Sequence, residues 1–179
     1  MYLEPRVSTQ RITKFWLASS LLIIAACSQS GIDPNPKIDT PPTPTAVPLP
    51  ITILPDGFEV EMELATSPEE TTTGLMFRPS LPANRGMLLL WQQERRATIW
   101  MMNVLVPLDI IFLDNAGEVV ALVEDARPCS AEPCPRFSPE IQARAVLEIA
   151  AGGVAEHGIE VGSKLRFERV PGYPAPAVE

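Results

Sequence analysis

The sequence predicts a mainly β domain with minor helix, folded as a compact antiparallel β-sandwich or a partly closed barrel. Residues 58–64 alternate apolar and acidic side chains, which is typical of a strand with one buried face. Several further short apolar runs follow along residues 51–170, with turn signals between them. Only one segment carries the full start signal of a helix, so we expect a single short helix beside the strands.

The expected strands are residues 58–64, 87–91, 97–101, 110–113, 119–123, 145–149 and 164–168. Asp114-Asn115-Ala116-Gly117 separates the fourth and fifth and predicts a hairpin turn. Ser67-Pro68-Glu69-Glu70 combines an N-cap serine, a proline at the first helical position and a capping-box glutamate. It predicts a helix that continues to about Met76, and a second helical turn is expected at residues 153–157.

Residues 1–26 are predicted to be a lipoprotein signal peptide. The apolar stretch 15–24 is shorter than the ~20 residues of a spanning helix, and small residues precede Cys27. The basic residues before it are Arg6, Arg11 and Lys14. The pattern resembles the lipobox of bacterial lipoproteins, in which the cysteine is lipidated; the alternative is a short anchor helix with an incidental cysteine. We therefore expect an exported chain anchored through Cys27 to a bacterial membrane, on its periplasmic or cell-surface side.

The remainder divides into a tether, a domain and a tail. Residues 27–50 are proline-rich and predict a disordered tether, residues 51–170 form the domain, and residues 171–179 are expected to be a flexible tail. Without residues 1–26 the chain keeps 21 acidic and 11 basic side chains, a formal charge of about −10. Such a charge disfavours nucleic acid as a partner, because binding phosphate requires a basic face.

Two cysteines, Cys129 and Cys134, lie inside the predicted domain. In an oxidising compartment this pair predicts a local disulfide. A redox-active or metal-binding pair is the alternative, disfavoured because the spacing is C-x4-C and no other cysteine or histidine is near. The sequence predicts no metal site and no cofactor.

Four motifs follow one another along the domain. They are Gly74-Leu75-Met76-Phe77-Arg78, Arg85-Gly86-Met87-Leu88, Trp100-Met101-Met102-Asn103-Val104-Leu105-Val106-Pro107-Leu108-Asp109-Ile110-Ile111-Phe112 and Ala145-Val146-Leu147-Glu148. With Gly152, Gly158-Ile159 and Val161-Gly162, they resemble the family DUF192, also called UPF0127, over residues 58–169. The resemblance implies a compact β-rich fold, often secreted or lipid-anchored, whose biochemical role is not established. It also implies basic residues where Thr71, Thr73 and Met102 stand, and a threonine in place of Val104.

The candidate ligand-binding residues are Arg78, Trp100, Asn103, Asp109 and Glu148. Arg78 is expected to pair with Asp109 or Glu148, either clamping two loops or binding a ligand. Asp109 is expected to cap backbone N–H groups or to join that site. Glu148 would be costly to bury unpaired, so we expect Arg78 or Arg144 beside it. Trp100, with Met101 and Met102, either packs in the core or walls a pocket.

Other chemistry finds little support in the sequence. His157 is the only histidine and lies in an expected turn, and no G-x-S-x-G nucleophile motif, P-loop or dinucleotide fingerprint is present. Thioethers suit copper(I), and the domain holds Met76, Met87, Met101 and Met102. In an apolar chain, however, methionines more often fill the core.

Three functions remain open. The first is a non-enzymatic lipoprotein that binds a small ligand or a protein partner on a surface joining Arg78, Trp100, Asn103 and Asp109. The second is a hydrolase of envelope polymers that uses Asp109 and Glu148 as paired carboxylates, which would have to lie ~5–9.5 Å apart in one cleft. The third is a structural assembly module, for which a large exposed apolar patch would be the sign.

Overall fold

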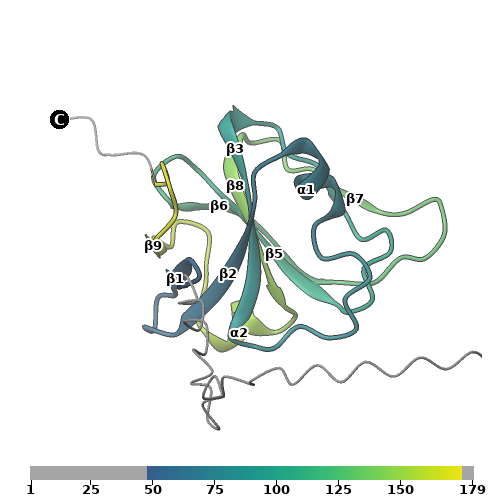
Figure 1. Ribbon diagram of the computed structural model, residues 1–179, viewed down its shortest axis with the longest axis horizontal. Coiled ribbons are helices and arrows are strands. Elements are labelled where there is room, and N and C mark those ends of the chain that lie inside the picture. The colour runs from purple at the N-terminus through teal and green to yellow at the C-terminus, as the bar shows by residue number, and fades with distance from the viewer. Residues whose placement is uncertain (1–47, 175–179) are drawn as a thin grey trace, which may run out of the picture. The chain divides into compact units, whose positions relative to one another are not determined.

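The computed structural model describes residues 48–174, which form a mainly β domain built on one curled, half-barrel sheet (Figure 1). Seven strands lie in the order β6-β5-β8-β3-β2-β1-β9, and β4 and β7 form a separate pair. The strands are β1 Ile51–Ile53, β2 Glu59–Ala65, β3 Arg85–Arg95, β4 Ile99–Trp100, β5 Leu108–Leu113, β6 Val119–Ala126, β7 Arg136–Phe137, β8 Ala143–Ala150 and β9 Arg166–Glu168; the helices are α1 Pro68–Thr73 and α2 Gly153–Glu156. The mainly β prediction is confirmed. Cys27, the predicted signal peptide and most of the predicted tether lie outside the described residues.

The sheet is mixed rather than purely antiparallel. β2 and β3 run parallel, with Glu61 opposite Arg85 and Ala65 opposite Leu89, while the other neighbours are antiparallel. The expectation of an antiparallel sheet is therefore wrong at this pair. Its cause is the connection through α1, because parallel strands need a crossover whereas antiparallel strands can be joined by a tight turn.

The helix start is built as the sequence predicts. The Ser67 hydroxyl accepts a hydrogen bond from the Glu70 backbone N–H at 3.2 Å, and Glu70 Oε2 accepts from the Ser67 N–H at 3.0 Å. α1 ends at Thr73 rather than near Met76, because Gly74 adopts φ 47° and ψ −129°, a conformation open in practice to glycine. α1 buries none of its own side chains.

The predicted hairpin joins β5 and β6. Asp114 Oδ1 accepts hydrogen bonds from the backbone N–H groups of Ala116 and Glu118, both at 2.8 Å, and Gly117 has φ 80°. The second helical turn is also confirmed, as α2. The short strands β1 and β7 are not predicted, because two or three residues carry no readable periodicity.

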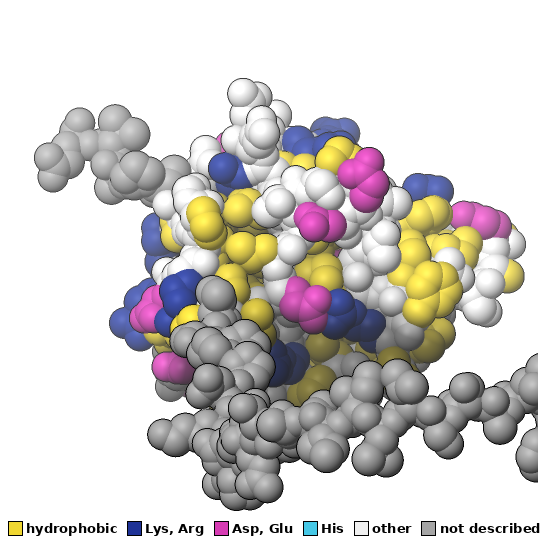
Figure 2. All heavy atoms as spheres, in the orientation of Figure 1, with side chains coloured by type: hydrophobic (Ala, Val, Ile, Leu, Met, Phe, Trp, Pro, Cys, Tyr) yellow, Lys and Arg dark blue, Asp and Glu magenta, His cyan; other side chains and the backbone are white. Residues whose placement is uncertain are grey.

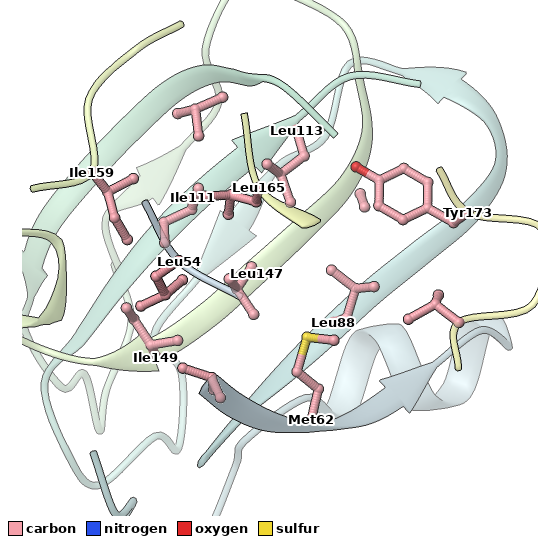
Figure 3. Close-up of a cluster of buried hydrophobic side chains, with 14 of the residues drawn as sticks. Leu54, Met62, Leu88, Ile111, Leu113, Leu147, Ile149, Ile159, Leu165 and Tyr173 are labelled. Carbon is pink, nitrogen blue, oxygen red and sulfur yellow. The ribbon is translucent and has the colours of Figure 1, made fainter. Parts of the chain in front are cut away.

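Two apolar clusters cover the two faces of the sheet. Leu88, Ile111 and Leu147 lie in one, where they meet Leu54, Ile159, Leu165 and Tyr173 from the segments outside the central strands (Figure 3). Leu89, Phe112 and Val146 lie in the other, with Leu75, Ile99 and Met101. Successive residues of a strand point to opposite faces, so each central strand feeds both clusters. Tyr173, within the predicted tail, is buried and donates its hydroxyl hydrogen to the Asp114 carbonyl at 2.9 Å.

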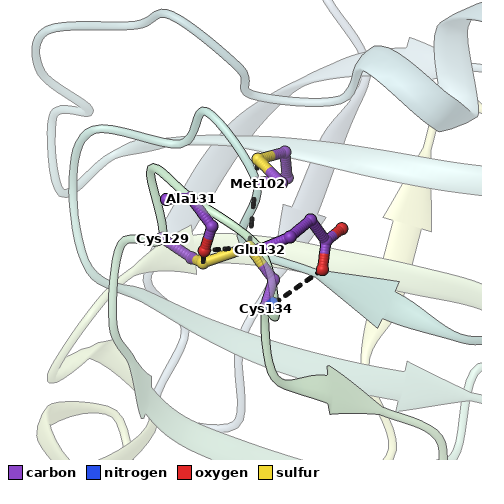
Figure 4. The surroundings of a disulfide bond; sticks show 5 residues. All are labelled: Met102, Cys129, Ala131, Glu132 and Cys134. Atoms are coloured by element: carbon purple, nitrogen blue, oxygen red, sulfur yellow. Dashed lines mark hydrogen bonds between the residues drawn. A yellow bond between two sulfur atoms is a disulfide. The ribbon is translucent and has the colours of Figure 1, made fainter.

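Cys129 and Cys134 form the predicted disulfide, with Cα atoms 5.9 Å apart (Figure 4). Glu132 Oε2 accepts a hydrogen bond from the Cys134 N–H at 2.9 Å, and Met102 Sδ lies 3.9 Å from Cys134 Sγ. Cys129 also bridges to Met102 through the backbone, so the disulfide loop is fixed against the segment that follows β4.

Within residues 48–174 there is no helix of the length and apolarity needed to cross a membrane, and no group of three potential metal-ligating side chains.

Candidate functional site

A cleft of about 280 Å³ opens over the sheet face that carries Leu89, and Ile99 of the β4–β7 pair also lines it. Its walls come from segments far apart in the sequence: α1 and Gly74, the C-terminal half of β3, and the β4–β7 pair. The polar and aromatic lining residues are Thr71, Thr72, Thr73, Trp91, Arg95, Thr98, Trp100, Arg136 and Glu148. The remaining lining is mainly aliphatic and includes Leu75 and Val104.

Glu148 brings a nearly buried carboxyl group to this cleft from the central strand β8. The residue is 5 % exposed, and its side chain takes part in no hydrogen bond or ion pair among the described residues. Burial raises the pKa of the Glu148 carboxyl to about 7, since removal from water disfavours the charged form. The expectation that Arg78 or Arg144 would pair with it is wrong.

Gly74 covers the Glu148 carboxyl from above. A Cβ atom placed on Gly74 would lie 3.6 Å from Glu148 Oε2, so the backbone after α1 passes directly over the acid. A second cavity, of about 350 Å³, lies beyond this segment and shares Thr73 and Gly74 with the cleft. α1 is therefore flanked by cavities and anchored by its ends rather than by buried side chains of its own.

Each tryptophan of the cleft carries an arginine over its ring. The Arg136 guanidinium carbon lies 4.9 Å from the centre of a Trp100 ring, and that of Arg95 lies 5.6 Å from Trp91. Such cation–π contacts hold the arginines in place while leaving their N–H groups free to donate. Neither arginine belongs to an ion pair in the described part of the chain.

Arg78 lies outside this cleft. Its guanidinium donates two hydrogen bonds to Glu63, Nη1 to Oε1 at 2.5 Å and Nη2 to Oε2 at 2.7 Å. This contact lowers the pKa of Glu63 and raises that of Arg78. The predicted pairing with Asp109 or Glu148 is wrong, and Arg78 lines the second cavity instead.

Asp109 is completely buried and serves the backbone. Oδ2 accepts hydrogen bonds from the N–H groups of Gly152 and Val154 at 3.0 and 2.9 Å, and Oδ1 accepts from Asp125 N–H at 2.9 Å. Gly152, the N-cap of α2, has no side chain to cap the helix. Asp109 supplies that cap from β5, so the expectation that it caps backbone N–H groups is confirmed.

The paired-carboxylate hypothesis fails on strand register. In the β5–β8 ladder Asp109 lies opposite Ile149, and Glu148 lies opposite Ile110. Residues opposite each other share a face, and adjacent residues do not. Asp109 therefore points to the face of Ile149, and Glu148 to the face of Ile110. The two carboxyl groups cannot act on one substrate.

Asn103 and His157 contact other parts of the domain and do not line the cleft. Asn103 has φ 59°; its N–H donates to the Cys129 carbonyl at 2.9 Å and its carbonyl accepts from Phe77 N–H at 2.8 Å. His157 stacks on Phe58 with ring centres 4.2 Å apart, and its Nδ1 lies 2.8 Å from Asp56 Oδ2. The predicted surface joining Arg78, Trp100, Asn103 and Asp109 does not form; of the five candidates, only Trp100 and Glu148 meet in the cleft.

Arg95 and Arg136 are not among the binding residues that the sequence predicts, and Trp91 is predicted only as part of a strand. No local signal singles out these arginines, because they are 41 positions apart and meet only through tertiary structure. Thr71 and Thr73, two positions at which the family resemblance implied arginine, do line the cleft. Met102, the third, lies against the disulfide instead.

Comparison with known proteins agrees with this fold. The family model DUF192, described as "Uncharacterized ACR, COG1430", matches residues 51–167, and the chain belongs to this family. A solved structure from Sinorhizobium meliloti 1021, described as a putative transcription regulator, is 29 % identical with a TM-score of 0.60, covering 66 % of this chain and 91 % of that one. A protein of unknown function from Novosphingobium aromaticivorans DSM 12444 is 33 % identical with a TM-score of 0.60, covering 65 % and 82 %. No curated protein matches the chain.

Proposed function

We propose that the protein is an envelope-anchored lipoprotein whose DUF192 domain binds a small organic ligand in the cleft between α1, β3 and the β4–β7 pair. One observation carries the proposal: Glu148 is nearly buried, has no protein partner in the described chain and borders the cleft. Buried polar groups are almost always hydrogen-bonded in folded proteins, so an unpartnered one facing a cavity calls for a ligand or water there.

The dimensions and lining of the cleft support binding. A volume of about 280 Å³ is close to the lower end of known small-ligand pockets, which are mostly apolar with a few well-placed polar groups. Trp91 and Trp100 offer flat apolar surfaces, and the arginines beside them offer donors. This is the chemistry of a binding site for a compact molecule.

Binding is favoured over catalysis because the candidate catalytic groups are separated. The Asp109 carboxylate is occupied by three backbone N–H groups on the face opposite Glu148. His157 lies in a different, small cavity with Leu54 and Ile149.

The role named for the Sinorhizobium protein is disfavoured for this chain, because a net charge of −8 is poorly suited to binding nucleic acid. Figure 2 shows basic and acidic side chains interspersed on the face in view.

The anchoring part of the proposal rests on the apolar run that ends at Cys27. A thioether-linked diacylglyceryl group plus an N-linked acyl chain would give the two or more lipid chains that stable attachment requires. Replacement by Cys27→Ser should move the protein from the membrane fraction to the soluble fraction and abolish incorporation of a labelled fatty acid. Unchanged labelling in Cys27→Ser would overturn the lipid anchor.

The binding proposal is tested by thermal unfolding of the full-length protein in detergent against amino acids, sugars, peptidoglycan fragments, nucleotides and small anions. A ligand at 100 times its dissociation constant adds about 2.7 kcal/mol, which moves the midpoint of a domain of this size by several degrees. The shift should vanish in Trp100→Ala and persist in Arg78→Ala, because Arg78 lies outside the cleft. The absence of any shift, or its loss in Arg78→Ala alone, would contradict this site.

A further inference from the structure

We propose that the ligand of this cleft is a zwitterion of the amino-acid type, with its cationic group on Glu148 and its anionic group on Arg95 and Arg136. This inference rests on the proposed function and specifies the chemical class of the ligand. It comes from the distribution of unpaired charge in the cleft.

The first step is that both signs of charge are present and unmatched. Arg78, Arg85, Arg127 and Arg169 each pair with a carboxylate on the surface of the domain. Arg95, Arg96, Arg136, Arg144 and Arg166 form no ion pair among the described residues. Of these, Arg95 and Arg136 line the cleft, where they contact tryptophan rings. Glu148, which borders the same cavity, also has no partner among residues 48–174.

The second step is that the cleft cannot neutralise itself in this conformation. No nitrogen of Arg95 or Arg136 lies within 4.0 Å of the Glu148 carboxylate, the limit for an ion pair among the described residues. Glu148 is nearly buried on the central strand β8, whereas the two arginines are exposed at the ends of β3 and β7. A molecule that carries both a cationic and an anionic group would satisfy both sets of groups together.

The rest of the cleft lining is largely apolar. Ile99, Val104 and Leu75 are buried and line the cleft together with the half-buried Trp100. Apolar lining beside charged groups suits a molecule that also carries a hydrocarbon or aromatic part. A free amino acid carries an ammonium group, a carboxylate and an apolar side chain on one carbon, and it is compact enough for a cavity of about 280 Å³.

The pH dependence of affinity distinguishes a zwitterion from a purely anionic ligand. With a pKa of about 7, Glu148 is about half ionised at neutral pH. A bound ammonium group would favour the ionised carboxylate, whereas a purely anionic ligand would favour the protonated acid. Affinity for a zwitterion should therefore rise about tenfold from pH 6 to pH 8, because the ionised fraction rises from roughly one tenth to nine tenths.

The other charged groups near Glu148 do not supply this effect. Within the cleft they are Arg95 and Arg136. Beyond Gly74, the second cavity holds Glu63, Glu69, Glu70 and Arg78. Hydrogen bonds lower the pKa of Glu63 and Glu70, and the Glu69 side chain is exposed to solvent. Asp109 and His157 belong to the opposite face of the sheet.

The test is calorimetric titration of the full-length protein in detergent with the twenty L-amino acids. The tightest binder is then compared with its analogue lacking the amino group and its analogue lacking the carboxyl group. Both analogues should bind at least tenfold more weakly than the parent, and the parent should release protons on binding near pH 7. An analogue without the amino group that binds as tightly as the parent would overturn the proposal, as would affinity that falls with pH.

Substitutions in the cleft test the binding of the ammonium group and of the carboxylate separately. Glu148→Gln should weaken the parent at least tenfold and abolish its pH dependence, and Arg136→Gln should remove the advantage of the parent over the amine. Arg85→Gln, whose arginine pairs with Glu61 outside the cleft, serves as the control. Far-UV circular dichroism of each variant confirms that the fold is retained.

This inference and the proposed function can fail separately. If none of the twenty amino acids binds at 10 mM while a sugar, nucleotide or simple anion gives a shift that Trp100→Ala removes, the zwitterion is wrong and the binding cleft stands. If no compound of any class binds, both are wrong.

Discussion

Asp109 and Glu148 lie on neighbouring strands, one position out of register, with their carboxyl groups on opposite faces of the same sheet. The two acids accordingly have opposite surroundings. Asp109 accepts three backbone hydrogen bonds, whereas Glu148 has no partner among the described residues and borders a cleft. One acid stabilises the fold and the other is available for a ligand.

Replacing Asp109→Asn should destabilise the domain by about 2–4 kcal/mol, because an amide NH2 group replaces one of the two buried oxygens that accept hydrogen bonds from three N–H groups. Urea denaturation of the full-length protein at pH 7 measures the change. Glu124→Gln is the matched control, since Glu124 is exposed on the neighbouring strand β6 and should change stability by less than about 0.5 kcal/mol. Equal effects of the two substitutions would show that Asp109 does not hold α2 in place.

Replacing Glu148→Gln should stabilise the protein in alkaline solution. The folded pKa of about 7 exceeds the unfolded value near 4.5, so the native state binds the proton more tightly than the unfolded chain does. Stability from this group is fully present below pH 4.5 and is lost as the pH rises through 7, a loss of about 3 kcal/mol. Glutamine carries no charge and avoids that loss.

The measurement is urea denaturation of both proteins at pH 4.5 and pH 8.5. We expect Glu148→Gln to exceed the wild type by about 3 kcal/mol more at pH 8.5 than at pH 4.5. A difference in stability that does not depend on pH would mean that the carboxyl is not desolvated in the native protein.

Arg78→Ala should cost less than about 1 kcal/mol, despite the two short hydrogen bonds to Glu63. The side chains of Arg78 and Glu63 remain 36 % and 48 % exposed, and water screens ion pairs of this kind. A double-mutant cycle with Glu63→Gln isolates the pairwise energy. A coupling above about 2 kcal/mol would assign this pair a larger structural role than its exposure allows.

Removal of the disulfide by Cys129→Ser with Cys134→Ser should lower the free energy of unfolding by about 2 kcal/mol, because the two cysteines close a short loop. Reduction of the wild-type protein should have the same effect. Ligand affinity in the cleft is the informative second readout, since the disulfide loop is bonded to the segment between β4 and β5. A loss of stability far above 2 kcal/mol would show that the loop packs more strongly than its size suggests.

The sequence by itself was sufficient for features that depend on neighbouring residues. The capping box at Ser67, the β5–β6 hairpin turn at Asp114 and the Cys129–Cys134 disulfide each involve residues within a few positions of one another. Alternation in residues 58–64 fixed which side chains of β2 are buried, because a strand repeats every two residues. The family motifs predicted a β-rich fold for residues 58–169 as a whole.

Tertiary structure decided the rest. Trp91, Arg95, Trp100, Arg136 and Glu148 come together only because β8 lies beside β3 while the β4–β7 pair closes the same face. Strand order and register are long-range properties, and they placed Asp109 and Glu148 on opposite faces and Arg78 beside Glu63. No local pattern encodes these relationships, since they arise from how strands distant in the chain pair and from which face each side chain then points to.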